Sequence, residues 1–290
     1  SFGKGAFGEV IQCLDHKTNT IVAIKILVNT PVMRRQGAIE VTNLRLVSSR
    51  TSSKYIEKVI DSFTFREHMC IVTEILGNSL LNYILSNKFS ASSSKQVKSI
   101  IFDLVSGLFD IHRSNIIHAD IKPENILFLT NSDSHVKIID FGSSCAVGRT
   151  VYNYLQSRYY RAPEVILGIP YNTAIDMWSL GCILCEIITG KPIFNGINEK
   201  DQLKKIIEAI GLPPQSMLTQ CTRKKDFIGP DGKLFGNPQP YKNRLSSTLR
   251  IGDSQMLDFI TKCLAWEPSK RLTAEKALQH SWLAPNPTKK

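Results

Sequence analysis

The spacing of the apolar residues changes near Leu76, and this change limits the folds that the chain can adopt. Before that point, short runs rich in Val, Ile and Thr predict β-strands, interrupted by one helical stretch at about 32–47. After it, apolar residues recur at three- and four-residue steps, which is typical of amphipathic helices. This segregation predicts an α+β fold, in which a small β-rich lobe precedes a larger, mainly helical lobe.

The same pattern gives the expected elements and boundaries. Strands are predicted at 9–14, 21–28, 55–64, 68–73 and 136–139. Helices of the larger lobe are predicted at 97–112, 173–189, 199–210, 255–265 and 273–280. Residues 212–249 are rich in Pro, Gly, Lys and Asn, so we expect an irregular insertion there. The expected lobes are 1–76 and 77–290, with a hinge at about 74–78. Because the chain starts at Ser1 and not at an initiator methionine, we interpret it as a domain excised from a longer protein.

Charge, hydropathy and cysteine content indicate which partners and which cellular compartment to expect. The 290 residues include 36 Lys and Arg against 25 Asp and Glu, a net charge of +11. These positive charges are dispersed and no nucleic-acid-binding motif accompanies them, so nucleic acid is not an expected partner. No apolar run reaches the ~18 residues of a membrane helix, so no membrane partner is expected either. The seven cysteines are irregularly spaced, which predicts a soluble intracellular protein of the cytoplasm, the nucleus or both.

A glycine pattern opens the chain, with Gly3, Gly5 and Gly8 spaced as GxGxxG and followed by Val10. Alone it is a weak signal, because dinucleotide-binding folds use the same spacing. Those folds need a helix directly after the glycines, whereas here a second strand follows and carries Lys25. Glycine lets the backbone approach phosphate oxygens closely, and Lys25 supplies a positive charge for the α and β phosphates of a nucleotide.

The segment 118–125, HADIKPEN, carries side chains suited to phosphoryl transfer. Asp120 can orient an incoming hydroxyl or accept its proton, and Lys122 can neutralise the transferring phosphoryl group. Asn125 and Asp140, the latter in an Asp-Phe-Gly sequence, offer oxygen ligands to a hard cation such as Mg²⁺. A lone Asp in a loop is usually a turn or cap residue, but several such motifs in this order are poorly explained by coincidence.

Two ion pairs are expected to support the site. Glu40, on the first predicted helix, is the candidate partner of Lys25, although a glutamate on a helix face is usually just solvated. Glu164 closes an Ala-Pro-Glu sequence and needs a cationic partner if it is buried. Arg271, near the C-terminus, is the candidate partner.

With these motifs in place, the whole chain resembles a eukaryotic protein kinase domain. More narrowly, residues 140–145 and 151–164 are very similar to the dual-specificity tyrosine-phosphorylation-regulated kinases, in the group that includes cyclin-dependent and MAP kinases. The resemblance implies a two-lobed protein kinase fold with ATP and Mg²⁺ as cofactors. It also implies a dual-specificity enzyme that phosphorylates Ser and Thr of protein substrates and autophosphorylates on tyrosine.

The resemblance implies a role for each matching residue. The backbone groups of Glu74 and Leu76, in the hinge, would bind adenine, and Val10 and Ala23 would lie against its ring. The expected catalytic residues are Lys25, Asp120, Lys122, Asn125 and Asp140, of which Asn125 and Asp140 would bind the metal. The expected nucleotide-binding residues are Gly3, Lys4, Gly5, Ala6, Phe7, Gly8, Val10, Ala23, Lys25, Glu40, Thr73, Glu74, Leu76 and Leu127.

The Tyr-Asn-Tyr sequence at 152–154 is the most specific part of the resemblance, and it implies autophosphorylation of Tyr154 during maturation. Phosphotyrosine adds about −1.5 to −2 charge, and Arg158 and Arg161 follow closely enough to clamp it. The alternative is that both arginines only bind carboxylates. Ala119 replaces the arginine with which most kinases hold such a phosphate, as it does in the related homeodomain-interacting kinases.

Thr73 departs from the family, which usually has phenylalanine just before the hinge. We expect the smaller side chain to open space behind the adenine, so the inhibitor selectivity of the family does not carry over.

Substrate preference is also implied only by resemblance. Arg161 before Ala162 is similar to the proline-directed kinases, which implies Ser or Thr followed by Pro. Glu124 and Glu186 match positions that bind substrate arginine in other kinases, although Glu186 lies in an apolar helix where a structural role is equally reasonable. The domain is expected to act as a monomer.

Three alternatives remain open from the sequence. A homeodomain-interacting-kinase-like enzyme shares residues 155–164 but lacks the first tyrosine of the Tyr-x-Tyr signature. A pseudokinase scaffold is suggested by Ala119 and the basic surface, but it would be expected to lack one of the catalytic residues, all of which are present. The third alternative, a nucleic-acid-binding module, is supported only by the net positive charge of the chain.

Overall fold

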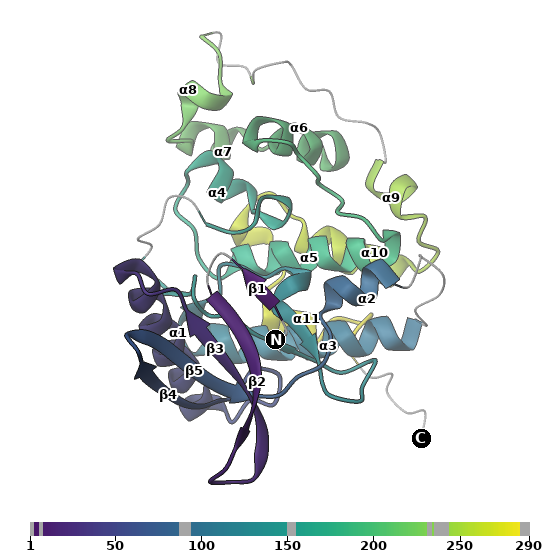
Figure 1. The fold of residues 1–290 in the computed structure, drawn as a ribbon. Coiled ribbons are helices and arrows are strands. Elements are labelled where there is room, and N and C mark those ends of the chain that lie inside the picture. The colour runs from purple at the N-terminus through teal and green to yellow at the C-terminus, as the bar shows by residue number, and fades with distance from the viewer. Residues whose placement is uncertain are drawn as a thin grey trace.

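A five-stranded antiparallel sheet forms the N-terminal lobe, with the strand order β1-β2-β3-β5-β4. The computed structural model describes residues 3–5, 8–86, 94–149, 155–230, 234 and 244–284. The strands of this sheet are β1 (Gly3–Gly5), β2 (Gly8–Asp15), β3 (Thr20–Leu27), β4 (Val59–Phe65) and β5 (His68–Glu74). One long helix, α1 (Pro31–Thr51), lies against β3, β4 and β5 (Figure 1).

Local sequence explains where α1 begins and which face it buries. The hydroxyl of Thr30 caps the helix by accepting a hydrogen bond from the Met33 N–H at 3.2 Å, and Pro31 occupies the first turn. Val41 lies on the inner face and packs against β3 and β5. Glu40 lies on the same face and is only 3% exposed, so α1 carries a carboxylate into the interior.

Helices form most of the C-terminal lobe, so the two-lobed α+β fold is confirmed (Figure 1). The helices are α2 (Leu80–Ser86), α3 (Ser94–Arg113), α4 (Pro163–Leu167), α5 (Ala174–Thr189), α6 (Glu199–Ile210), α7 (Gln215–Gln220), α8 (Lys224–Phe227), α9 (Arg244–Leu249), α10 (Ser254–Cys263) and α11 (Ala274–Leu278). Single 3₁₀ turns occur at Pro123–Asn125, Arg158–Tyr160 and Pro268–Lys270.

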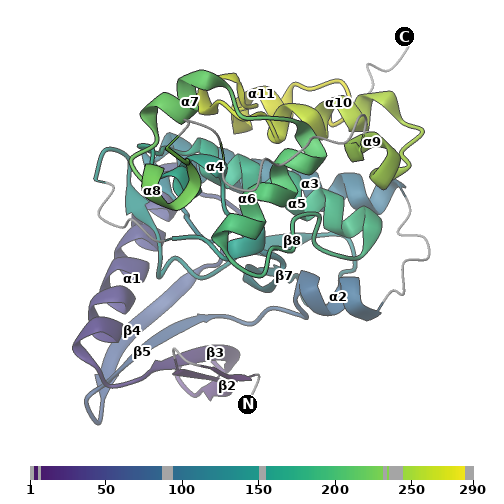
Figure 2. The same cartoon turned by 90° about the horizontal axis from the view of Figure 1, so that it is seen from above.

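Four short strands lie between these helices: β6 (Ile116–Ile117), β7 (Ile126–Phe128), β8 (Val136–Ile138) and β9 (Cys145–Ala146). β6 pairs with β9, and β7 pairs with β8. Figure 2 shows β7 and β8 on the side of the lobe that faces the N-terminal sheet. The loops around these strands are therefore held at the junction of the two lobes.

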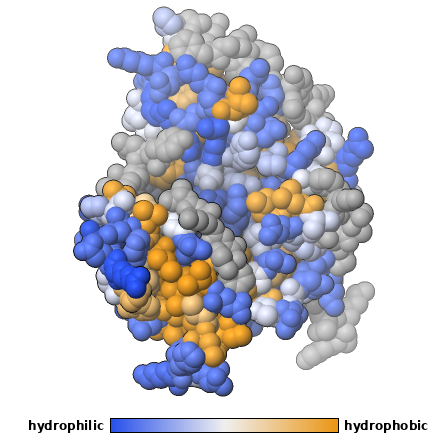
Figure 3. All heavy atoms as spheres, in the orientation of Figure 1, coloured by the Kyte–Doolittle hydropathy of each residue, from blue (hydrophilic) through white to orange (hydrophobic). Residues whose placement is uncertain are grey.

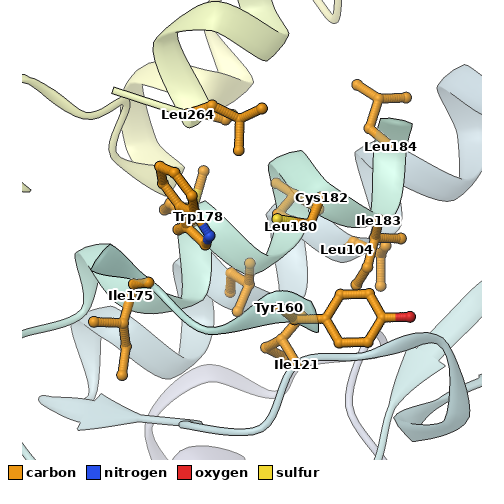
Figure 4. Close-up of a cluster of buried hydrophobic side chains, with 14 of the residues drawn as sticks. Leu104, Ile121, Tyr160, Ile175, Trp178, Leu180, Cys182, Ile183, Leu184 and Leu264 are labelled. Carbon is orange, nitrogen blue, oxygen red and sulfur yellow. The ribbon is translucent and has the colours of Figure 1, made fainter. Parts of the chain in front are cut away.

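α5 is the centre of the C-terminal core. Every residue from Ile175 to Glu186 is buried. Figure 4 shows Trp178 of α5 near Leu264, which follows α10, while Leu104 of α3 lies close to the more C-terminal part of α5. The helix ends at Gly190, whose φ of 68° suits a residue without a side chain. α5 thus gives the loops at the lobe junction a rigid base.

A buried ion pair ties the helices of this lobe together. Arg271 and Glu164 both have 0% of their side chain exposed, and their paired nitrogens and oxygens lie 2.7 and 2.9 Å apart. The other N–H groups of the guanidinium donate to the carbonyls of Ala265, Trp266 and Ala174. The predicted partnership is confirmed, and it joins the starts of α4 and α5 to the segment after α10.

Two sequence expectations differ from the structure. The strand predicted at 55–64 begins only at Val59, because Tyr55 and Glu57 hydrogen-bond instead to Ile138 of β8. The segment 212–249, expected to be irregular, contains α7, α8 and α9 among its described residues. Helices of four to six residues are too short to show a periodic apolar face, which is why the pattern missed them.

The surface differs between the two lobes. Side chains over α6 and α8 are mainly hydrophilic, whereas apolar side chains gather over the N-terminal sheet (Figure 3). The exposed large apolar residues in the strands of this sheet are Leu14, Ile21, Ile60, Phe63 and Phe65. In the part of the chain that the structure describes, no helix combines the length and apolar character needed to cross a membrane.

We predict that Arg271→Met destabilises the fold by about 3–5 kcal/mol, because it leaves the buried Glu164 carboxylate without its partner. Urea unfolding followed by circular dichroism measures this. Lys270→Met is the matched control, since Lys270 pairs with Glu267 at the surface with 72% of its side chain exposed. The control should change the free energy of unfolding by less than about 1 kcal/mol. Equal unfolding midpoints for the two variants would contradict the prediction.

Candidate active site

Lys25 of β3 joins the two lobes through ion pairs. Its Nζ lies 2.9 Å from both carboxylate oxygens of Glu40 and 3.1 Å from Oδ1 of Asp140. Burial disfavours the charge on Lys25, but Glu40 and Asp140 outweigh this effect and raise its pKa above the ordinary value. The expected partnership of Lys25 with Glu40 is confirmed.

The two carboxylates respond differently to the shared lysine. Burial raises the pKa of Glu40, and the attraction of Lys25 does not fully offset this. Burial also disfavours the charge on Asp140, but there Lys25 prevails and the pKa is lowered. Asp140 is therefore the carboxylate that stays ionised most readily, which suits a ligand for a cation.

Asp140 leaves β8 in an unusual backbone conformation. Its φ is +62°, which is uncommon for a residue other than glycine. The Gly142 N–H donates to its Oδ1 at 3.2 Å. Phe141, between them, is fully buried, and its ring meets that of His118 edge-on at 4.9 Å. These contacts hold the carboxylate toward Lys25.

One buried carboxylate, Asp176, positions the loop that carries Asp120. Asp176 lies in the first turn of α5 and accepts the backbone N–H groups of His118 and Ala119, each at 2.9 Å. It also hydrogen-bonds the ring of His112 at 2.9 Å. Ala119 has a φ of +66°, and these bonds help to hold this uncommon conformation. The core of the lobe therefore sets the place of Asp120.

Asp120 is surrounded by donors. Lys122 Nζ lies 2.7 Å from its Oδ2. Its Oδ1 accepts the backbone N–H and the hydroxyl of Ser157 at 3.0 and 2.9 Å. Asn125 donates its amide N–H to the Asp120 backbone oxygen at 2.9 Å. This donation does not use the Asn125 amide oxygen, which can serve as an acceptor or as a ligand to a cation. A carboxylate held like this can orient a hydroxyl and take its proton.

Residues of both lobes line one cavity. Lys25 and Glu40 contribute from the N-terminal lobe, and Asp120, Asp140 and Gly142 from the C-terminal lobe. The oxygens of Asp140 and Asn125 form a donor set that fits a hard divalent cation, and the lysines fit phosphate oxygens. Together these groups can bind a metal–nucleotide complex and place a phosphoryl group beside Asp120.

The glycine segment forms β1 and β2, which pair antiparallel. Gly8 has a φ of +146°, and an added Cβ would lie 2.0 Å from a backbone oxygen of β3, so no other residue fits there. Val10 lies opposite Lys25 in the sheet. Gly3, Lys4 and Gly5 form β1, whereas Ala6 and Phe7 lie outside the described residues.

The expected adenine-binding segment begins at the end of β5. Thr73 is 6% exposed and lies opposite Ala23. The carboxylate of Glu74 pairs with Lys137, whose Nζ lies 2.6 Å from its Oε1. Leu76 follows in an irregular, partly exposed stretch. Leu127, in β7, forms a β-bridge with Ser79 just after this stretch, so the two lobes meet here.

Arg158 and Arg161 both form hydrogen bonds with other described residues. Arg161 is 2% exposed, pairs with Glu199 at 2.8 Å and donates to two backbone carbonyls just after Tyr154. Arg158 donates to the carbonyl of Ile197 at 2.8 Å. Tyr154 itself lies outside the described residues, so the phosphotyrosine clamp stays a prediction.

Sequence reasoning missed several residues that the fold brings to the site. Ser157 and Asp176 are described above. A Ser shortly before Ala-Pro-Glu and an Asp opening an apolar helix are the signals that could have indicated them. A third contact joins α1 to the chain after Asp140, because Asn43 donates to the hydroxyl of Ser144 at 2.8 Å. The same hydroxyl donates to the Phe141 carbonyl at 2.6 Å.

Glu186 has a structural partner. It is 3% exposed and accepts the hydroxyl of Tyr160 at 2.7 Å. Burial raises the pKa of Glu186 to about 7, against the effect of this hydrogen bond. Glu124, in contrast, is exposed. Of the two glutamates, only Glu124 is open to a substrate in this conformation.

Known proteins are similar in sequence to this chain over almost its whole length. Residues 1–283 match the protein kinase domain family. The chain is 41% identical over 292 residues to dual specificity tyrosine-phosphorylation-regulated kinase 4 of Homo sapiens, covering 98% of this chain and 56% of that protein. It is 41% identical over 290 residues to the DYRK-family kinase pom1 of Schizosaccharomyces pombe, covering 97% of this chain and 27% of pom1.

A third relative is similar to the chain to the same degree. Dual specificity tyrosine-phosphorylation-regulated kinase 2 of Drosophila melanogaster is 41% identical over 293 residues, covering 98% of this chain and 41% of that protein. The chain thus spans between about a quarter and just over half of the length of these relatives. With the site geometry described above, these similarities show that the chain is a protein kinase domain that belongs to the dual-specificity tyrosine-phosphorylation-regulated kinase family.

Proposed function

We propose that this domain transfers the γ-phosphoryl group of MgATP to Ser and Thr of protein substrates and phosphorylates its own Tyr154. The observation that carries the proposal is the shared cavity, where Lys25 from one lobe faces Asp120 and Asp140 from the other. An accidental surface cleft would not bring these groups together with their charges already balanced. That every catalytic side chain is present argues against a scaffold without chemistry.

In this proposal each residue has one task. Mg²⁺ would be held by Asp140 and Asn125, and it would supply charge neutralisation at the phosphates. Lys25 would bind the α and β phosphates, while Glu40 keeps the lysine in place. Asp120 would orient the substrate hydroxyl and take its proton, with Ser157 and Lys122 holding the carboxylate. Catalysis would then come mainly from positioning and electrostatics.

We further assign Ser or Thr followed by Pro as the preferred target, on the resemblance of Arg161 and Ala162 to proline-directed kinases. Adenine would bind the backbone groups of Glu74 and Leu76. A location in the cytoplasm, the nucleus or both agrees with the free thiols of all seven cysteines. We also assign the domain as a monomer. A phosphate on Tyr154 would have to share Arg161 with Glu199.

We predict that Asp120→Asn lowers kcat for a Ser-Pro peptide by roughly 10²–10⁴, because the amide cannot accept the substrate proton. Steady-state kinetics with MgATP measure this. Asp133→Asn, at an exposed loop position, is the control and should behave like the parent. Full activity of the Asp120 variant would exclude this residue as the base.

The contact between Asn43 and Ser144 should couple α1 to Asp140. We predict that Asn43→Leu lowers kcat/KM for ATP by about fivefold, the value of one hydrogen bond, and that Ser144→Ala lowers it at least as much, because Ser144 also donates to the Phe141 carbonyl. The double variant should be no worse than Ser144→Ala, because Asn43→Leu removes only the hydrogen bond that Ser144→Ala has already removed. Thr42→Ala, on the exposed side of α1, is the control. Additive losses would show that the two residues act separately.

Tyr154 gives a direct test of autophosphorylation. Peptide mass spectrometry of protein made in bacteria should find a phosphate on Tyr154 in the parent and none in Asp120→Asn. Tyr154→Phe should lower kcat several-fold, because the phosphate can no longer tie down the segment before Arg158. Tyr152→Phe is the matched control and should keep the activity. An unmodified Tyr154 in active parent enzyme would refute the proposed modification.

A further inference from the structure

A cavity of about 170 Å³ lies in the C-terminal lobe and has no part in the proposed reaction. It is enclosed by the end of α5, the loop that follows this helix, α6 and α9, and α9 packs against both α5 and α6 (Figure 1). We call it the lysine cavity, and its described lining residues are Thr189, Lys191, Pro192, Ile193, Asn195, Lys205, Ala209 and Thr248. A protein cavity of about 150 Å³ can hold a benzene molecule, so this one has room for a small ligand.

The loop after α5, which forms one wall of the lysine cavity, is fixed at both ends. At its start, the hydroxyl of Thr189 lies 3.0 Å from the carbonyl oxygen of Lys191. At its end, the Gly196 N–H donates to the side-chain oxygen of Gln202 at 2.9 Å. Between these points Phe194 is fully buried, and its ring stacks on the indole of α5 with the centroids 5.7 Å apart. The core therefore sets the backbone that carries Lys191, and the cavity is formed before any ligand binds.

Two positive charges enter the lysine cavity, and none of its described lining residues is acidic. Lys191 comes from the loop and Lys205 from α6, and within the described chain neither forms an ion pair. The acidic residues nearest to Lys205 along α6 have other contacts. Asp201 accepts a backbone N–H of the loop at 3.0 Å, and Glu208 lies 4.0 Å from Lys204. An anion in the cavity would offset the repulsion between the two ammonium groups.

The polar groups of the lysine cavity suit a phosphate group. Lys205 is partly buried, whereas Lys191, Asn195 and Thr248 are exposed, so the cavity opens to the surface on their side. A phosphate monoester carries about −1.5 to −2 charge at pH 7, which two ammonium groups can neutralise. A carboxylate would neutralise only one of them. The amide of Asn195 and the hydroxyl of Thr248 are further groups that can donate to phosphate oxygens.

We propose that the lysine cavity is a binding site for a phosphate group, which is carried by a phosphorylated protein segment or is free as inorganic phosphate. The inference goes beyond the proposed function, because no residue of this cavity is assigned to catalysis. The loop continues past the cavity to Gly196 and Ile197, whose carbonyls accept N–H groups of Arg158 at 3.4 and 2.8 Å. A phosphorylated segment bound here would therefore contact the same loop as the residues that precede α4.

The rate at which single lysines are acetylated by acetic anhydride, measured by peptide mass spectrometry, tests this site on the intact domain. The probes are inorganic phosphate, a phosphoserine tripeptide and the same tripeptide with unmodified serine, at constant ionic strength and about pH 8, where the phosphate is dianionic. A phosphate ligand at roughly ten times its Kd should slow the acetylation of Lys191 and Lys205 by about tenfold. Lys225, exposed on α8, is the internal control and should react at an unchanged rate.

The pattern of protection identifies the source of the phosphate. Protection by the phosphoserine tripeptide and not by its unmodified form supports a phosphorylated protein segment, and protection by inorganic phosphate alone supports the free ion. If neither probe protects Lys191 and Lys205, the site is refuted. Equal protection of Lys225 would also refute it, because the effect would then be general screening of surface charge. Binding at the proposed active site is read separately, from Lys25.

Two variants assign the binding to the lysine cavity. Lys205→Gln should weaken the protection of Lys191 at least about tenfold in Kd, the value of one hydrogen bond from a charged group. Asn195→Asp, at an exposed position that does not endanger folding, should abolish the protection, because it places a negative charge beside the ligand. Lys225→Gln removes the same charge as Lys205→Gln elsewhere and should leave Kd unchanged. Equal Kd values for the three variants would overturn the proposal.

Discussion

The ammonium of Lys25 links the two lobes, because it pairs with Glu40 on α1 and with Asp140 after β8. One cation between two carboxylates from different lobes fixes the distance across the cavity and sets the ionisation of both acids. Asp140 is kept charged, whereas Glu40 is more costly to charge because it is more deeply buried. A site that must gather phosphate oxygens and a metal ion needs this balance before the ligand arrives.

The C-terminal lobe supplies the rigidity on which that link depends. Asp176 uses one buried carboxylate to hold two backbone groups of the loop before Asp120. Arg271 and Glu164 hold the Ala-Pro-Glu sequence at the start of α4 to the core. Both contacts are fully buried, where an unpaired charge is expensive, so each helps to maintain the one arrangement that satisfies all its partners. The N-terminal lobe meets this base through Lys25 and through the contact of Asn43 with Ser144.

Much of the site was predictable because its chemistry is local in sequence. The HADIKPEN and Asp-Phe-Gly motifs are contiguous in the sequence, and the GxGxxG pattern is visible from its spacing alone. Partners far apart in sequence were predictable only where a charge would otherwise be buried alone, as for Glu164 with Arg271. Ser157 and Asn43 carry no charge and gave no such signal, since a serine or an asparagine is usually a surface residue. Their roles come from the neighbours that folding gives them.

The sequence by itself determined the class of fold, the order of the motifs and the family, because periodicity and motif spacing are properties of the linear chain. Only the tertiary structure decided that Arg161 pairs with Glu199 and that Glu186 accepts a hydrogen bond from Tyr160. Burial, pKa and hydrogen-bond partnership depend on distances between segments that lie far apart in the chain. Those distances exist only after the apolar faces of sheet and helices have packed together.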